Sequence, residues 1–184
     1  MSHGLPTYFA AESAERTAVS EGRRALEQQF ERILRDYGPA LSRVASGYEP
    51  NSSMRDELIQ EIAMAIWQAL PGFRGECSER TFVYRIAHNR ALTHVWKRRP
   101  LHEPLHELEE SQQPVDPRAR PEAAAAQRHQ RERLMKAIHS LPVMHRQVIT
   151  LMLEDFSYTE MAEVLGISEN NVAVRLNRAK KALK

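Results

Sequence analysis

The 184-residue chain has little of what marks secreted, membrane-spanning or disulfide-rich proteins. Its one cysteine, Cys77, excludes an internal disulfide framework and suits a reducing compartment. The first 22 residues contain no apolar stretch suitable for a signal peptide. The longest apolar-rich run, residues 62–70, is too short to cross a bilayer. We therefore expect a soluble, cytoplasmic protein without membrane insertion.

The chain also lacks the patterns of a catalytic centre. No clustered carboxylates, no HExxH pattern and no Cys/His ligand set occur in it. His102 and His106 have the spacing of metal ligands on a helix, but Pro104 lies between them and no second ligand pair is near. The sequence therefore predicts no catalytic residue, metal or cofactor. A hydrolase or metalloenzyme acting on nucleic acid is the alternative from the enzyme class.

Residues 53–70 form the first half of the most informative stretch, in which two helical patterns flank a Pro-Gly loop. Leu58, Ile62 and Ile66 recur at helical spacing and predict a buried face. Ser53 is placed to cap the start of this helix, and Pro71 follows its end. The opposite face carries mainly acid and amide side chains: Glu57, Gln60, Glu61, Met64 and Gln68. From periodicity alone, that face is either solvated or a docking surface.

The second helix is expected to begin near Ser78 and to end in a basic run at residues 97–99. It interleaves aromatic residues with arginines, as Phe82, Tyr84 and Arg85 illustrate. Exposed rings can stack on unpaired bases while guanidinium groups contact phosphates, so the pattern favours single-stranded nucleic acid. The alternative is that Phe82 and Tyr84 are ordinary core residues.

The regions on either side of this stretch differ from it in composition. Residues 1–21 are polar and are expected to be flexible, and residues 21–47 form a helix that Gly38 and Pro39 should break or kink. Residues 48–53 form a turn. Residues 100–125 are Pro-rich and acidic without an apolar stripe, which predicts an extended linker.

Helical patterns resume near Ala124 and end in a predicted helix-turn-helix. Leu134, Ile138 and Leu141 form one apolar stripe, and Pro142 could occupy the first position of the next helix. Residues 157–160, SYTE, read as a capping box. Gly166 then makes a turn before a capping serine and a basic amphipathic helix over residues 169–184. This order is typical of DNA-binding helix-turn-helix units.

Three motifs, DELIQE, FRGECSERTFVYRIAHNRAL and SYTEMAEVLGISENNVAVRLNRAKKAL, together resemble the extracytoplasmic-function sigma factors of bacterial RNA polymerase. The resemblance covers residues 30–99 and 131–184. It implies an all-α protein with two small helical domains joined by an extended acidic linker. The implied boundaries are a flexible segment 1–21, a region 2 domain at 22–99, the linker at 100–125 and a region 4 helix-turn-helix at 126–184.

The resemblance also implies partners and their contact residues. The chain would bind core RNA polymerase at the beta-prime clamp helices and the beta flap. It would bind promoter DNA in both double- and single-stranded form. An anti-sigma factor would restrain the chain. The residues that match the clamp contact are Asp56, Gln60 and Glu61. Those assigned to the minus-ten strand, in part as a pocket for a flipped base, are Ala69, Phe73, Ile86, Asn89, Arg90, Lys97 and Arg98. Those that match the minus-thirty-five reading face are Asn170, Asn171, Ala173, Val174, Arg175, Asn177 and Arg178.

Four residues depart from the family pattern in ways that bear on the promoter sequence rather than on the class of function: Glu79, Thr93, Ala173 and Val174. Cys77 also departs from the pattern, and as a single cysteine it has no resolving partner for a redox switch. We therefore predict an alternative transcription initiation factor that directs core polymerase to specific promoters and helps melt them. A stand-alone helix-turn-helix regulator is the alternative, although it would need neither the acidic linker nor the DELIQE face.

Overall fold

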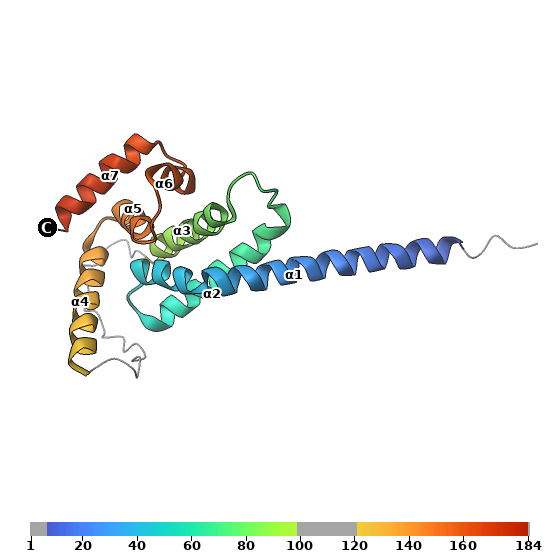
Figure 1. Cartoon of the computed structure of the whole chain (residues 1–184), viewed down its shortest axis with the longest axis horizontal. Helices are drawn as coiled ribbons and strands as arrows, with labels where there is room; N and C mark the ends of the chain where they lie inside the picture. The colour runs from blue at the N-terminus through green and yellow to red at the C-terminus, as the bar shows by residue number, and fades with distance from the viewer. Residues whose placement is uncertain (1–6, 99–120, 184) are drawn as a thin grey trace, which may run out of the picture.

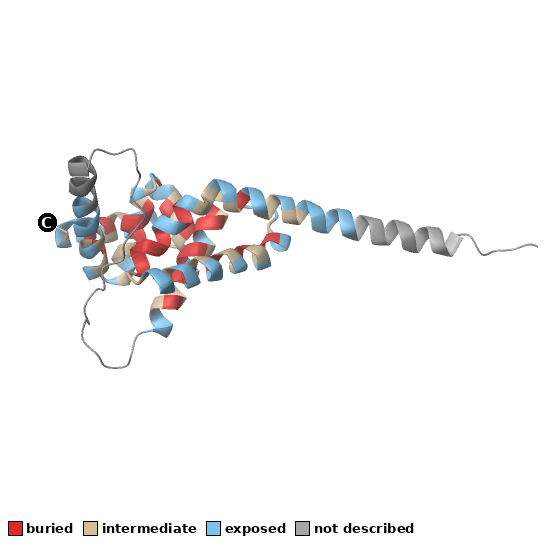
Figure 2. Ribbon diagram, turned by 90° about the horizontal axis from the view of Figure 1, so that it is seen from below, coloured by how far each residue is buried: buried red, intermediate tan, exposed pale blue. Residues whose placement is uncertain are grey.

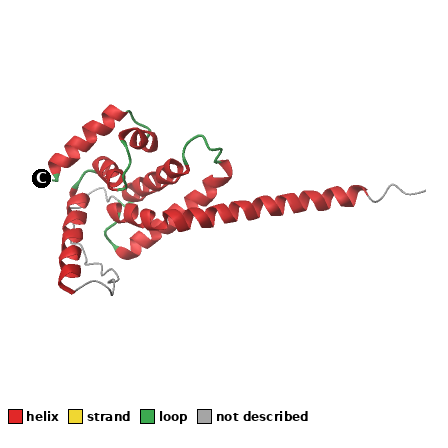
Figure 3. Ribbon diagram, viewed as in Figure 1, coloured by secondary structure: helices red, strands yellow, loops and turns green. Residues whose placement is uncertain are grey.

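The computed structural model describes residues 7–98 and 121–183 of the chain, and side chains within residues 20–98 and 129–183. All regular structure in these ranges is helical, which confirms the predicted all-α class (Figure 3). No helix in these ranges is both long enough and apolar enough to cross a membrane. The helices, in chain order, are α1 Thr7–Tyr48, α2 Ser52–Ala69, the 3-10 helix η1 Leu70–Gly72, α3 Glu79–Lys97, α4 Pro121–Ser140, α5 Val143–Leu153, α6 Tyr158–Leu165 and α7 Glu169–Ala182.

Helices α1, α2 and α3 pack on one another around an apolar core, and α1 extends beyond this bundle (Figures 1 and 2). Ile62 and Ile66 of α2 are fully buried, as are Val83 and Ala87 of α3. Burial of each large aliphatic side chain contributes about 1.5–3 kcal/mol relative to its exposed state. The apolar spacing read from the sequence therefore fixes which faces of α2 and α3 meet, and so which faces remain outside.

Helix α1 is longer than the helix expected over residues 21–47. Residues 7–20 are part of it, in keeping with their alanines, glutamates and arginines, which favour helix. Helix α1 also continues through Pro39, where a break or kink was expected. Proline removes one backbone hydrogen bond. The buried Ala40, Leu41 and Val44 anchor the following turn to the bundle and keep it helical.

The boundaries of α2 and α3 follow their capping residues. Asn51, not the expected Ser53, caps α2, because its side chain accepts a hydrogen bond from the Met54 backbone amide. At the other end, α2 passes into η1 where Pro71 and Gly72 occur, as the sequence predicted. Ser78 caps α3 by accepting from the Thr81 amide, which confirms the expected start of that helix.

The start of the C-terminal helices differs from the prediction. Helix α4 begins at Pro121, so residues 121–125 are helical, although they were assigned to the linker. The rest of the predicted linker, residues 100–120, lies outside the described residues, and so does the His102/His106 pair within it. In the apolar stripe, Ile138 and Leu141 are buried but Leu134 is 44% exposed. Pro142 precedes α5 as its N-cap instead of occupying its first position.

The predicted helix-turn-helix is present in α6 and α7. Ser157 and Glu160 form the capping box, and Ser168 caps α7 through the Asn171 amide. Gly166 ends α6 with φ of +65°, a left-handed conformation that glycine adopts without the strain a side chain would add. Met161 and Val172 are buried, as is Leu176, so the two helices share one core and the outer face of α7 remains exposed.

Candidate nucleic-acid interface

A shallow depression of about 480 Å³ lies between α2 and α3. Four residues predicted to contact the minus-ten strand line it: Ala69, Ile86 and Asn89, which were expected in the flipped-base pocket, and Arg90. Ala69 comes from the last turn of α2, and the others come from the middle of α3. We call this depression the α2–α3 groove. Packing of the two helices therefore brings together residues that are about twenty positions apart in the sequence.

Three further residues line the groove that the sequence reasoning missed: Ala65, Gln68 and Thr93. Gln68 had been assigned to the general polar face of α2. The sequence did hold a signal for its role in the groove: Gln68 follows Ala65 by three residues and directly precedes Ala69, so the three lie near one side of the helix. Thr93 donates a hydrogen bond from its hydroxyl to the Asn89 carbonyl at 2.9 Å, which leaves its oxygen lone pairs free.

The groove has the chemistry of a slot for a flat polar ring. Its walls include the small side chains of Ala65 and Ala69 and the aliphatic side chain of Ile86. The side-chain amides of Gln68 and Asn89 are exposed, and neither bonds to another described residue. An amide offers donors and an acceptor together, as the pairing edge of a base does. Two such free groups beside apolar walls can hold a base by its edge and its face.

Phe73 does not line the groove, although it was predicted to form part of it. Its ring stacks on that of Phe82, with centroids 4.4 Å apart and planes 29° apart. The stack connects the loop after η1 to the first turns of α3. Phe73 is half-buried, so part of its ring remains accessible beside the groove.

The predicted basic run at the end of α3 is only partly free. Lys97 is exposed, whereas Arg98 approaches Glu57 at 3.5 Å and Glu49 at 3.6 Å. His94, one turn earlier, lies with its Nε2 atom 3.0 Å from Glu49 and is buried. These contacts hold the last turn of α3 against the turn that joins α1 to α2. Arg98 thus has a structural contact beside its predicted contact with DNA.

The predicted docking face lies on the outer side of α2. Asp56, Gln60 and Glu61 are all exposed, and none bonds to another described residue. Met64, one turn further on, is 62% exposed. An exposed acidic and amide surface with an apolar residue at its edge suits a basic protein partner. The same surface would repel phosphates, so it is distinct from the groove in its chemistry.

The predicted reading face of α7 is exposed along its length. Asn170, Asn171, Val174, Asn177 and Arg178 are exposed, while Ala173 and Arg175 are half-buried. Arg175 donates from Nε to the Asn171 side-chain oxygen at 3.1 Å, which orients its guanidinium along the helix. Buried Val172, Leu176 and Ala179 hold the opposite face. The helix therefore presents amides, arginines and one small apolar patch to solvent.

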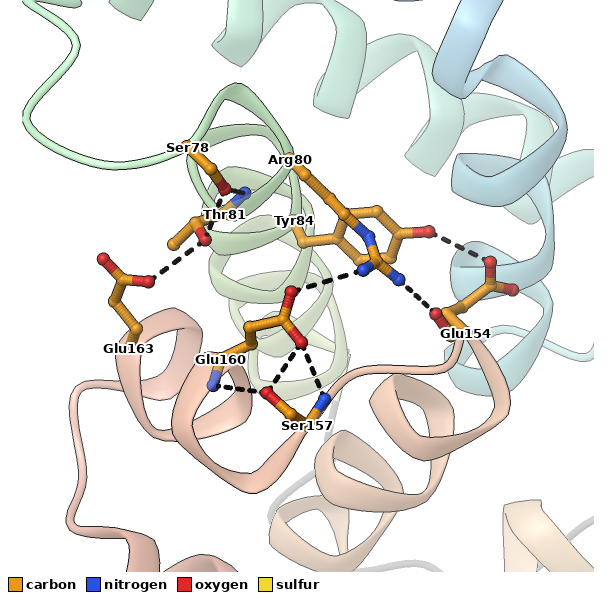
Figure 4. A network of polar contacts seen from close by, with 8 residues as sticks. All are labelled: Ser78, Arg80, Thr81, Tyr84, Glu154, Ser157, Glu160 and Glu163. Carbon is orange, nitrogen blue, oxygen red and sulfur yellow. Dashed lines mark hydrogen bonds and ion pairs between the residues drawn. The ribbon is translucent and has the colours of Figure 1, made fainter.

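A capping box stabilises the N-terminus of α6, where the helix-turn-helix begins (Figure 4). Glu160 accepts from the Ser157 backbone amide at 2.8 Å and from its hydroxyl at 2.7 Å. The pKa of Glu160 is lowered mainly because the Ser157 backbone amide donates to its carboxylate. The charged carboxylate at the first turn of α6 also interacts favourably with the helix dipole.

Comparison with known families accounts for both groups of helices. The family described as Sigma-70 region 2 matches residues 33–100, and that described as Sigma-70, region 4 matches residues 131–183. The ECF RNA polymerase sigma-E factor of Escherichia coli K12 is 27% identical over 176 residues, which cover 92% of each chain. The RNA polymerase sigma factor CnrH of Cupriavidus metallidurans is 26% identical over 179 residues, covering 94% of this chain and 93% of that protein.

Two solved structures share the fold. CnrH, in complex with the cytosolic domain of CnrY, superposes with a TM-score of 0.62 and 24% identity, over 85% of this chain and 86% of that one. The sigma factor RpoE in complex with the anti-sigma factor NepR from Bartonella quintana superposes with a TM-score of 0.66 and 19% identity, over 85% and 94%. The arrangement of two helical units in one chain is therefore common to all three proteins.

Proposed function

Because the chain belongs to the extracytoplasmic-function sigma factors of RNA polymerase, we propose that three separate surfaces carry its contacts: the outer face of α2, the α2–α3 groove and the exposed face of α7. As a member of this family it directs RNA polymerase to promoters. The alternative of a stand-alone helix-turn-helix regulator is wrong, because region 2 accompanies region 4 in the same chain. The domains are taken as residues 22–99 and 126–184.

The α2–α3 groove is the proposed binding site for the melted minus-ten strand. The side chains that line this groove are the observation that supports the proposal most. A base can be read on its pairing edge only after it leaves the stack. The groove offers the two free amides of Gln68 and Asn89 for that edge, with Ala69 and Ile86 against the face of the ring. Arg90 at its rim supplies positive charge for the adjacent phosphate.

The outer face of α2 is the proposed contact with the clamp helices of the beta-prime subunit. Asp56, Gln60 and Glu61 are free for this contact, since none is bonded to a described residue. Charge complementarity at such a surface sets both the rate and the specificity of docking. The beta flap would contact the C-terminal helices. The protein would then supply binding and strand capture in the cytoplasm, while polymerase carries out all catalysis.

Helix α7 is the proposed reader of the minus-thirty-five element in the major groove. Arg175, Arg178 and Asn177 have the groups that pair with guanine or adenine edges or with phosphates. Restraint by an anti-sigma factor is proposed by analogy with RpoE, which was solved with the anti-sigma factor NepR.

Run-off transcription with purified core polymerase tests the proposal. We expect discrete run-off products from genomic fragments only when this chain is added. Glu61→Lys reverses a charge on the docking face and should reduce core binding by roughly 1–4 kcal/mol. Glu31→Lys makes the same charge reversal at an exposed site on α1 and is the matched control. Undiminished core binding by a folded Glu61→Lys protein would remove the clamp assignment.

A further inference from the structure

Helix α3 carries three aromatic residues, and the protein itself occupies two of them. The sequence pattern offered Phe82 and Tyr84 either as rings for unpaired bases or as core residues. Phe82 stacks on Phe73, and Tyr84 is buried with its hydroxyl bonded to Glu154. Trp96, in the last turn of α3, is 56% exposed, and its side chain forms no ring contact or hydrogen bond with any other described residue. A single exposed apolar side chain is common on protein surfaces, so the neighbours of Trp96 decide whether it has a role.

Trp96 continues the exposed stripe of α3 that passes the α2–α3 groove. Trp96 follows Asn89 by seven residues, so at about 100° and 1.5 Å per residue it lies within about 20° of the same side, roughly 10 Å further along the axis. Thr93, which lines the groove, lies between them. The buried Ala87 and Ala91 face the core from the other side of the helix. A strand that meets Asn89 and follows the helix towards its end therefore passes Trp96.

The residues around Trp96 suit a nucleic acid better than a protein partner. Lys97 is exposed and forms no ion pair with a described residue. Arg90, at the rim of the groove, lies two turns earlier on the same side as Lys97. The nearest residues of the exposed stripe, Asn89 and Thr93, are polar, so Trp96 is not part of the broad apolar patch that a protein interface uses at its centre. An exposed ring with cations beside it is the arrangement that stacks on a base and holds its phosphate.

Polar contacts on the inner side of the last turn of α3 hold Trp96 in place. The buried His94 lies with its Nε2 atom 3.0 Å from Glu49 Oε2, and Arg98 Nη1 is 3.6 Å from the same oxygen. The other carboxylate oxygen of Glu49 accepts a hydrogen bond from the Asn51 backbone amide at 3.0 Å. These contacts fix the backbone from which the Trp96 ring projects. Binding on a pre-positioned side chain loses less conformational entropy than binding on a mobile one.

We propose that Trp96 is a second base-binding position: its indole ring stacks on an unpaired base of the minus-ten strand, near the base held in the α2–α3 groove, and Lys97 contacts an adjacent phosphate. This rests on the proposed function. Stacked bases are about 3.4 Å apart, so the distance from Asn89 to Trp96 places the second base within about three nucleotides of the first. Every base has a π face, so Trp96 selects an unpaired base without selecting its identity. Asn89 then reads the strand, and Trp96 keeps it melted.

Binding of the full chain to a single-stranded minus-ten oligonucleotide, taken from a promoter that is active in run-off transcription, tests the stack. Trp96→Ala should weaken binding by about 5- to 100-fold, as expected for loss of one base–aromatic stack. Trp96→Phe should retain most of the affinity, because it keeps a ring. Trp96→Leu should lose it, because leucine is apolar but cannot stack. Tyr158→Ala removes a ring of similar exposure, 45%, from α6 and is the matched control that should leave this binding unchanged.

A scan with one abasic site at each position of the oligonucleotide locates the stacked base. At one position the abasic site should weaken binding of the wild type and cause no further loss in Trp96→Ala, because both changes remove the same stack. That position should differ from the one at which base preference relaxes in Asn89→Ala. Lys97→Ala should reduce the dependence of log affinity on log salt by about 0.7, the value for one phosphate contact on a single strand, whereas Trp96→Ala should leave it unchanged.

Tryptophan fluorescence separates this proposal from the proposed function. The chain has two tryptophans, and Trp67 packs edge-on against Phe30 with ring centroids 5.2 Å apart, so Trp67→Phe leaves Trp96 as the only emitter. Stacking should quench its emission when the minus-ten oligonucleotide or an oligothymidylate is added.

The oligothymidylate needs no promoter. Quenching by it would support the stack even if the wild type gave no run-off product, a result that would overturn the proposed function alone. No quenching by either oligonucleotide, or unchanged affinity of Trp96→Ala for the minus-ten strand, would overturn the stack. Loss of core polymerase binding in Trp96→Ala with unchanged oligonucleotide binding would assign the ring to a protein contact and overturn it as well.

Discussion

The two proposed DNA-reading surfaces are built in different ways. The α2–α3 groove takes residues from two helices, so its shape depends on how the N-terminal core packs. The reading face of α7 lies on one helix and depends on a cap, a glycine turn and three buried residues behind it. A concave site for an unpaired base needs walls, whereas a duplex groove needs only a convex helix of the right charge. The first surface should therefore be more sensitive to core packing than the second.

The largest expected effect comes from removing a core residue behind the groove. Ile66 is fully buried on the turn of α2 that also carries Ala65 and Gln68 of the groove. Ile66→Ala should destabilise the protein by about 2–5 kcal/mol through lost burial and a cavity. It should weaken binding of a single-stranded minus-ten oligonucleotide more than binding of a minus-thirty-five duplex.

Leu176→Ala in the core of α7 provides the matched comparison, with the reverse order of effects expected. Denaturant unfolding followed by circular dichroism gives the stability, and two separate binding titrations give the affinities. If each variant weakened both kinds of binding equally, the two surfaces would not be independent and the comparison would fail.

The contrast between features local to one helix and features set by packing between helices also explains how much of the structure the sequence could predict. Local features were predicted well: Ser78 caps α3, Ser157 and Glu160 form the capping box, and Gly166 makes the turn. These depend on neighbours three or four residues away, which the sequence displays directly. The resemblance to a family brought Ala69, Ile86, Asn89 and Arg90 to attention, and the structure places them in one groove.

Features set by long-range packing could not be read from the chain. Gln68 read as part of a polar face because its neighbours across the groove lie on another helix. The sequence left two roles for Tyr84, stacking on an unpaired base or packing in the core. The structure buries it where α3 meets the segment between α5 and α6. The ion pair of Arg43 with Glu154 joins positions that are 111 residues apart in the sequence. Nothing in local periodicity indicates such a pair.

The second prediction sharpens the proposed role of the groove. Asn89→Ala should weaken binding of a single-stranded minus-ten oligonucleotide by about 1–3 kcal/mol and relax base preference at one position. Gln68→Ala should affect the same position, since both free amides face one slot. Affinity for core polymerase should not change.

Gln28→Ala, an exposed amide on α1, is the control for a surface substitution of the same kind. Binding titrations on oligonucleotides substituted at each minus-ten position provide the measurement. Unchanged preference at every position in Asn89→Ala would show that Asn89 is not the reader. Relaxation in Asn89→Ala without any change in Gln68→Ala would remove only Gln68.

The third prediction concerns pH, because the N-terminal core buries a histidine behind the groove. Burial lowers the pKa of His88 from about 6.5 to about 3, while its Nδ1 atom lies 2.7 Å from the Tyr48 hydroxyl. The unfolded chain therefore binds one more proton between these pH values, and stability falls as pH drops below about 6.5. Between pH 7 and 5.5 the loss from His88 should be about 1 kcal/mol.

Denaturant unfolding at a series of pH values measures this slope. His139 has its pKa lowered by burial as well, so it contributes in the same direction. His88→Gln removes the titrating group and should flatten the slope by about one proton, even if the variant is less stable at every pH. An unchanged slope in His88→Gln would mean that another group accounts for the acid sensitivity.

The smallest expected effect lies on the convex surface. Val174 is 40% exposed and Ala173 is half-buried, and together they form the small apolar patch on the reading face of α7. The thymine methyl is the apolar group that the major groove offers. Burying one methyl contributes about 0.8 kcal/mol, or roughly a fourfold change in dissociation constant. We therefore expect the minus-thirty-five element to contain a thymine whose replacement by uracil weakens binding by about that factor, because uracil lacks only the methyl.

A set of duplexes with one uracil at each thymine position provides the measurement, and uracils outside the element serve as controls. Val174→Ala should reduce the sensitivity to uracil at the contacted position while leaving the rest of the sequence preference intact, because it shortens the apolar contact without altering Arg175 or Arg178. If no uracil weakens binding of the wild type, Ala173 and Val174 make no apolar contact with DNA. The specificity of α7 would then rest on its amides and arginines alone.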